Sequence, residues 1–113
     1  MPRLPSAIGY LRSDVSGARQ QWDENQIRRT AVRFGYDLSK IIVFGGATDQ
    51  PMKRLRVALD RQNTDAVITP SLRHFEPSEV PEELRAVAAV ITVSPEQIFA
   101  RWDTPAKPTG GLK

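Results

Sequence analysis

Residues 7–12 read Ala7-Ile8-Gly9-Tyr10-Leu11-Arg12, a short apolar run that follows Pro5 and precedes a polar pair, Ser13-Asp14. The length of the run and its β-forming side chains predict a buried strand. Three further apolar runs of strand length occur at residues 40–44, 65–69 and 87–93. Continuous apolar strands, without alternation of polar residues, are typical of a parallel sheet that is covered on both faces.

Segments with helical spacing separate these strands. Between about Trp22 and Phe34, Ile27 and Ala31 fall on one face of a helix. A second amphipathic segment begins near Asp49, which we predict as its N-cap, with Pro51 in the first turn. The alternation of strands and helices predicts a three-layer α/β, Rossmann-like domain with about four parallel strands flanked by helices.

The C-terminal part of the chain carries two shorter helix signals and a tail. Pro81 and the acidic residues after it predict a short helical turn. Ser94-Pro95 begins a capping-box pattern and predicts a final short helix that carries Ile98, Phe99 and Trp102. We therefore expect one domain over residues 1–102 and a disordered, Pro- and Gly-rich tail over residues 103–113.

The composition of the 113-residue chain narrows the classes of function. It contains no Cys and one His, His74, so we expect no disulfide, no metal site and no cofactor held by thiolates. No apolar run approaches the roughly 20 residues of a membrane helix, and no signal peptide is evident. We expect a cytoplasmic protein, and a bacterial nucleoid is one location within that expectation.

The net charge of +3 is unevenly distributed along the sequence. Residues 1–75 contain 12 Lys and Arg and 7 Asp and Glu, whereas residues 76–113 contain 4 and 6. A basic face on the first two-thirds of the chain is compatible with a polyanionic partner. The side chains that we predict to contact DNA phosphates are Arg12, Arg29, Arg33, Lys53, Arg54, Arg56, Arg61 and Arg73. The alternative interpretation is a solvated helix face.

The polar segments that follow the predicted strands carry a family resemblance. In order, they are Tyr10-Leu11-Arg12, then Asp49-Gln50-Pro51, then Leu72-Arg73-His74-Phe75. Over residues 7–93 this set resembles the N-terminal catalytic domain of serine recombinases, the resolvase/invertase family. The resemblance implies a resolvase-like fold, in which a serine attacks a DNA phosphodiester while several arginines neutralise the phosphate.

The chain departs from the family pattern at most of the reacting positions. Asp14 stands where the resemblance implies the nucleophilic serine, and a carboxylate repels a phosphate. Gln50 replaces an arginine, while Arg73 and His74 fall on positions that are aspartate and arginine in the family. Arg12 is the one arginine that clearly matches. The family's long dimerisation helix and helix-turn-helix domain have no counterpart among these residues.

These departures predict a non-catalytic, resolvase-like protein, a pseudoenzyme that acts by binding as a small DNA-associated or regulatory factor. A second hypothesis is a divergent recombinase or phosphodiesterase that uses Ser13 or Ser16 with Arg12. A third is a protein-interaction module. For that module, and for self-association, the predicted surface consists of Ile98, Phe99 and Trp102. Gly45-Gly46 is interpreted as a turn rather than an anion cradle.

Overall fold

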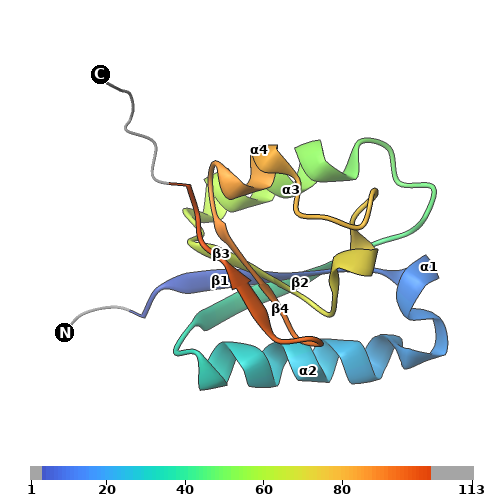
Figure 1. The fold of residues 1–113 in the computed structure, drawn as a ribbon, viewed down its shortest axis with the longest axis horizontal. Helices are drawn as coiled ribbons and strands as arrows, with labels where there is room; N and C mark the ends of the chain where they lie inside the picture. Colours follow the sequence, from blue (N-terminus) through green and yellow to red (C-terminus); the bar gives the residue numbers. More distant parts are fainter. Residues whose placement is uncertain (1–3, 103–113) are drawn as a thin grey trace.

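The computed structural model describes residues 4–102, and the predicted disordered tail, residues 103–113, lies outside the described residues. A five-stranded sheet in the order β2-β1-β3-β4-β5 forms the centre of the fold (Figure 1). The first four strands are mutually parallel, and β5 runs antiparallel to β4. The strands are β1 (Ser6–Arg12), β2 (Asp37–Phe44), β3 (Ala66–Thr69), β4 (Ala89–Thr92) and β5 (Gln97–Phe99).

Helices cover both faces of this sheet, with α3 and α4 on one side and α2 on the other (Figure 1). The predicted three-layer α/β architecture with four parallel strands is therefore confirmed. The helical segments are α1 (Ser13–Ser16), α2 (Gln20–Arg33), α3 (Pro51–Gln62) and α4 (Glu82–Arg85), with short 3₁₀ turns η1 (Gly17–Arg19) and η2 (Leu72–His74).

Alternation along β1 divides the buried side chains between two cores. Ile8 and Tyr10 lie in the core beneath α3 and α4, whereas Ala7 and Leu11 lie in the core beneath α2. All four side chains are at most 1% exposed. A strand that is buried on both faces needs apolar side chains at consecutive positions, which explains why residues 7–11 show no polar alternation.

The C-terminal helix predicted from Ser94-Pro95 is wrong, because residues 97–99 form the edge strand β5 instead. The side chain of Thr92 donates a hydrogen bond to the carbonyl of Pro95 at 2.6 Å within the turn. A short segment that pairs with the open edge of β4 satisfies backbone groups which an isolated single helical turn leaves unpaired.

This strand geometry separates the three residues predicted as one apolar surface. Ile98 pairs with Ile91 and so faces the α2 side of the sheet, where it is 62% exposed. Phe99 faces the opposite side, and the guanidinium of Arg85 lies 6.0 Å from its ring and 5.2 Å from the ring of Trp102. Ile98, Phe99 and Trp102 therefore do not form one continuous patch.

The predicted N-cap of α3 is also wrong. Gln50 occupies that position, in the left-handed conformation with φ of 49°, and no side chain caps the helix. Asp49 lies one residue earlier, where its carbonyl accepts a 2.8 Å hydrogen bond from Nε of Arg54. Pro51 begins the helix as expected, because its fixed φ suits the first helical position.

Gly9 allows α2 and β2 to pack closely against β1. A Cβ atom at this position would lie 2.8 Å from Cγ2 of Ile27 and 2.9 Å from Cγ1 of Ile41. Both distances are shorter than side chains tolerate, so a larger residue forces the packed side chains apart.

Replacing this glycine tests the packing. We expect Gly9→Ala to lower the free energy of unfolding by about 1–3 kcal/mol, because extra volume in a packed core strains its neighbours. Urea denaturation followed by circular dichroism measures the change. Gly45→Ala is the matched control, since the nearest atom to its added Cβ is Oγ of Ser13 at 3.9 Å. Equal effects of the two substitutions would contradict the packing explanation.

Candidate functional site

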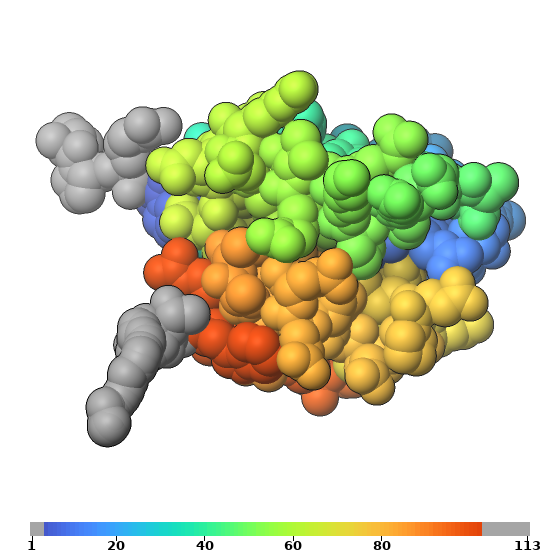
Figure 2. Space-filling view, turned by 90° about the horizontal axis from the view of Figure 1, so that it is seen from above, coloured from blue at the N-terminus to red at the C-terminus, as the bar shows by residue number. Residues whose placement is uncertain are grey.

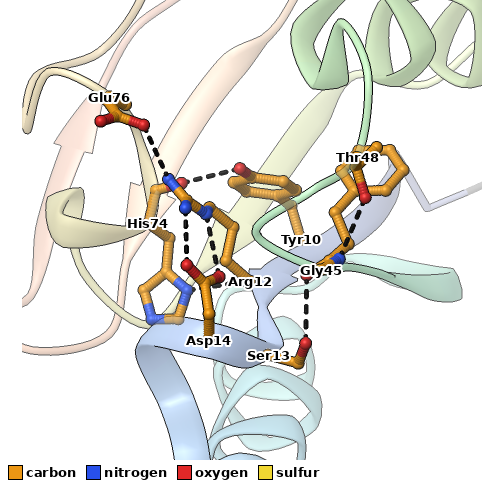
Figure 3. A network of polar contacts seen from close by, with 9 residues as sticks. Tyr10, Arg12, Ser13, Asp14, Gly45, Thr48, His74 and Glu76 are labelled. Atoms are coloured by element: carbon orange, nitrogen blue, oxygen red, sulfur yellow. Dashed lines mark hydrogen bonds and ion pairs between the residues drawn. The ribbon is translucent and has the colours of Figure 1, made fainter.

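Arg12 lies at the centre of a charged cluster at the carboxyl ends of β1 and β3 (Figure 3). Its Nη2 lies 2.6 Å from Oδ2 of Asp14, and its Nε donates to Oδ1 of the same carboxylate at 3.1 Å. Its Nη1 donates to Oε1 of Glu76 at 3.3 Å. The guanidinium thus binds two carboxylates, one of them through two nitrogens, which is the strong bidentate arrangement of such pairs.

These contacts fix the charges of the cluster. The hydrogen bond from Arg12 holds the pKa of Asp14 below its ordinary value, and the same hydrogen bond raises the pKa of Arg12. Both groups are therefore charged at neutral pH. With Glu76 as the second carboxylate, the cluster carries more negative than positive charge.

Buried His74 connects the end of β1 to η2. Its Nδ1 accepts a 2.9 Å hydrogen bond from the backbone N–H of Arg12, and its carbonyl accepts one of 2.7 Å from the hydroxyl of Tyr10. Burial raises the pKa of Tyr10 to about 12, so this hydroxyl stays protonated and donates. An Nδ1 atom that accepts a hydrogen bond requires the neutral imidazole with its proton on Nε2.

Neither candidate nucleophile is placed for attack on a phosphate beside Arg12. Oγ of Ser13 donates to the carbonyl of Phe44 at 3.4 Å, towards β2 (Figure 3). Oγ of Ser16 donates to Oδ2 of Asp23 at 2.7 Å, towards α2. Ser13 therefore bonds a backbone carbonyl and Ser16 bonds a carboxylate, and neither hydroxyl group bonds a guanidinium.

Gly46 makes room for the carboxylate of Asp14. A Cβ atom at residue 46 would lie only 2.8 Å from Oδ2 of Asp14. The preceding residue, Gly45, donates its backbone N–H to Oγ1 of Thr48 at 3.1 Å, which closes the turn predicted there. The loop thus packs against the partly exposed carboxylate of Asp14.

A small hollow of about 140 Å³ lies beside the cluster and is lined by Tyr10, Arg12, Gly45, Gly46, Thr48, Pro51, Met52, His74 and Glu76. The charged groups that line this hollow are the guanidinium of Arg12 and the carboxylate of Glu76. Asp14 binds the same guanidinium from its other side. Such a wall disfavours a phosphate dianion. Within residues 4–102, no group of three or more His, Cys, Asp or Glu side chains could hold a metal ion.

The structure brings together only part of the site indicated by the sequence. Arg12, Asp14 and His74 lie close together, as the segments that carry the family resemblance implied. Gln50 lies instead beside a separate hollow on α3, and Arg73 is exposed on η2, where it forms no ion pair with any residue of 4–102. Sequence reasoning missed Glu76, since no spacing rule relates it to a partner 64 residues away.

The two sets of basic side chains predicted for DNA do not share a surface. Arg29 and Arg33 lie on α2, whereas Lys53, Arg54, Arg56 and Arg61 lie on α3, on the opposite face of the sheet. Arg33 also forms an ion pair with Glu96 at 2.5 Å and stacks over Phe34 at 5.3 Å. A single strip built from both helices is therefore wrong.

The outer side of α3 lies beside α4 on the face shown in Figure 2. Lys53, Arg54 and Arg61 line a shallow hollow of about 420 Å³, together with Asp49, Gln50 and Val57. Lys53 and Arg56 also line a larger hollow of about 710 Å³ between α3 and α4, which contains the acidic residues Asp60, Asp65 and Glu83. The hollow lined by Lys53, Arg54 and Arg61 is therefore the more basic of the two.

Comparison with protein-family models, curated protein sequences and solved structures found no significant match to this chain. Among residues 4–102, no helix is both long enough and apolar enough to cross a membrane.

The buried imidazole predicts a pH dependence of stability. Burial lowers the pKa of His74, and nearby Arg12 and Arg73 lower it further, against the opposing charges of Asp23 and Asp14. The unfolded chain, with a His pKa of about 6.5, then binds more protons than the folded protein just below that pH. We expect the free energy of unfolding to fall as the pH drops through this range.

Urea titrations at a series of pH values between about 7 and 5 measure how the free energy of unfolding changes with pH. This range spans the unperturbed pKa of His. His74→Asn is the informative variant, because its side-chain oxygen can accept from the Arg12 N–H and does not titrate. Since the chain has one His, the slope lost in this variant belongs to His74. An unchanged slope would assign the pH dependence to the carboxylates.

Proposed function

We propose that this protein is a catalytically inactive, resolvase-like binding protein that contacts the phosphate backbone of nucleic acid through α3. The observation that carries the proposal is the exposed surface of Lys53, Arg54 and Arg61, which lines one hollow. The protein would act in the cytoplasm, where the nucleoid provides the polyanion. Assignment to the serine recombinase family rests on the resemblance of the segments that contain Arg12, Gln50 and Arg73.

The charge of the Arg12 cluster supports a loss of phosphoryl transfer. Asp14 occupies the guanidinium through two hydrogen bonds, at 2.6 and 3.1 Å, and Glu76 occupies the remaining side. A phosphate would have to displace both carboxylates and would meet no other cation from β1 or η2 except exposed Arg73. Transition-state stabilisation of phosphoryl transfer depends on several aligned cations, so this cluster is poorly suited to it.

The ion-pair pattern supports α3 as the contact surface. None of its four basic side chains pairs with a carboxylate of residues 4–102, whereas Arg12, Arg28 and Arg33 all do. Unpaired cations retain their attraction for phosphate, and each phosphate contact releases a condensed counterion. Asp49 and Asp60 offset two of the four positive charges of this segment, so its formal charge stays positive.

Replacing the basic side chains that line this hollow tests α3 as the contact surface. We expect the triple variant Lys53→Gln, Arg54→Gln, Arg61→Gln to bind duplex DNA much more weakly than the unmodified chain. The slope of log K against log salt concentration should become shallower by about 2–3, close to 0.9 for each lost contact. Fluorescence anisotropy at a series of salt concentrations measures both quantities.

The matched control is Arg19→Gln, Arg28→Gln, Arg29→Gln, which removes the same charge from exposed residues of η1 and α2. Equal weakening by both triple variants would show that net charge, not α3, determines binding. Absence of any binding by the unmodified chain at low salt would remove nucleic acid as the partner.

The hydrogen bonds of Ser13 and Ser16 give a separate prediction. We expect no covalent protein–DNA adduct when the chain is incubated with supercoiled or linear DNA and quenched with detergent, because Ser13 and Ser16 are bound to other groups. The double variant Ser13→Ala, Ser16→Ala should bind DNA as the unmodified chain does. An adduct that disappears in this variant would establish serine chemistry and overturn the proposal.

A further inference from the structure

The longest strand of the sheet lies at its edge. β2 has eight residues and pairs with β1 along its whole length, and within residues 4–102 no strand pairs with its outer side. The opposite edge strand, β5, has only three residues. An exposed edge presents a row of unpaired N–H and C=O groups, which is a template for another strand.

Side chains at this edge leave both cores incompletely covered. Ile42 and Phe44 pack against the core beneath α3, while Ile41 packs against the core beneath α2. All three are only partly buried, and Val43 is 39% exposed. A strand added beside β2 would therefore extend both cores.

Two features that discourage pairing are confined to the beginning of β2. The register with β1 shifts between Ala7 and Ile8, which leaves a bulge at Ser39, and Lys40 places an exposed charge on the edge. Bulges and lysines are common devices that block edge association. The segment 41–44 carries neither, and Gly45 ends it.

We propose that residues 40–44 of β2 pair antiparallel with the same residues of a second copy, which makes a two-fold dimer with one continuous sheet. A two-fold axis perpendicular to the sheet brings like faces together, so Ile42 meets Ile42 on one face and Ile41 meets Val43 on the other. An axis at Ile42 places Ile41 opposite Val43 and Lys40 opposite Phe44. The two lysines then lie at opposite ends of the paired segment, where like charges do not face each other.

The occupant is a second copy, because the identical edge supplies both the matching apolar residues and the separation of charge. Sedimentation equilibrium of the full chain over a range of concentrations should give a monomer–dimer equilibrium. Val43→Lys should raise the dissociation constant by about tenfold or more, since it puts a desolvated charge opposite Ile41. Val32→Lys on α2 is the matched control, because Val32 is 79% exposed, and it should leave the constant unchanged.

Amide hydrogen exchange of the unmodified chain gives a second measurement that needs no variant. Protection should rise with protein concentration at residues 41–44 and stay constant at β5. A strictly monomeric chain, a dimer that both lysine variants weaken equally, or concentration-dependent protection elsewhere would each overturn the proposal. Neither experiment contains nucleic acid, so its outcome is independent of the function proposed for α3.

Discussion

The two hydrogen bonds that His74 accepts hold the end of β1 in place. His74 is 2% exposed, so its Nδ1 and its backbone carbonyl have no water to replace the Arg12 N–H and the Tyr10 hydroxyl. Separating these groups would leave buried polar atoms unpaired, at a cost of about 1–3 kcal/mol each. The position of Arg12, and therefore of the whole charged cluster, follows from this connection between β1 and η2.

The chain thus separates its charges into two regions of different character. At the strand ends, the guanidinium of Arg12 is neutralised by Asp14 and Glu76, and Gly46 packs closely on the first of these carboxylates. On α3, the basic side chains have no acidic partner among the described residues. An excess of positive charge distributed in this way supports binding by α3 far better than chemistry at the ends of the strands.

Much of the fold could be predicted from local pattern, because β1, β3 and β4 are continuous apolar runs whose burial dictates their composition. The helices α2 and α3 were also predictable from their 3.6-residue spacing. The edge strand β5 was not, since Ser94-Pro95-Glu96-Gln97 satisfies a helix-start rule and only the unpaired edge of β4 decides otherwise. The contact between Arg12 and Glu76, and the placement of α2 and α3 on opposite faces, depend on chain crossovers that local spacing does not encode.

The position of β1 between β2 and β3 has a consequence for the folding kinetics. The backbone N–H of Ser6 bonds to the carboxylate of Asp65, 59 residues later in the chain, immediately before β3. Closing a loop of that length costs about 3–4 kcal/mol of chain entropy, which is lost before the contact stabilises the fold. Until β3 pairs with β1, the inner edge of β1 has no neighbouring strand, and neither core is complete. Contacts between residues this far apart in the chain slow folding, so we expect the docking of β3 against β1 to be a late step.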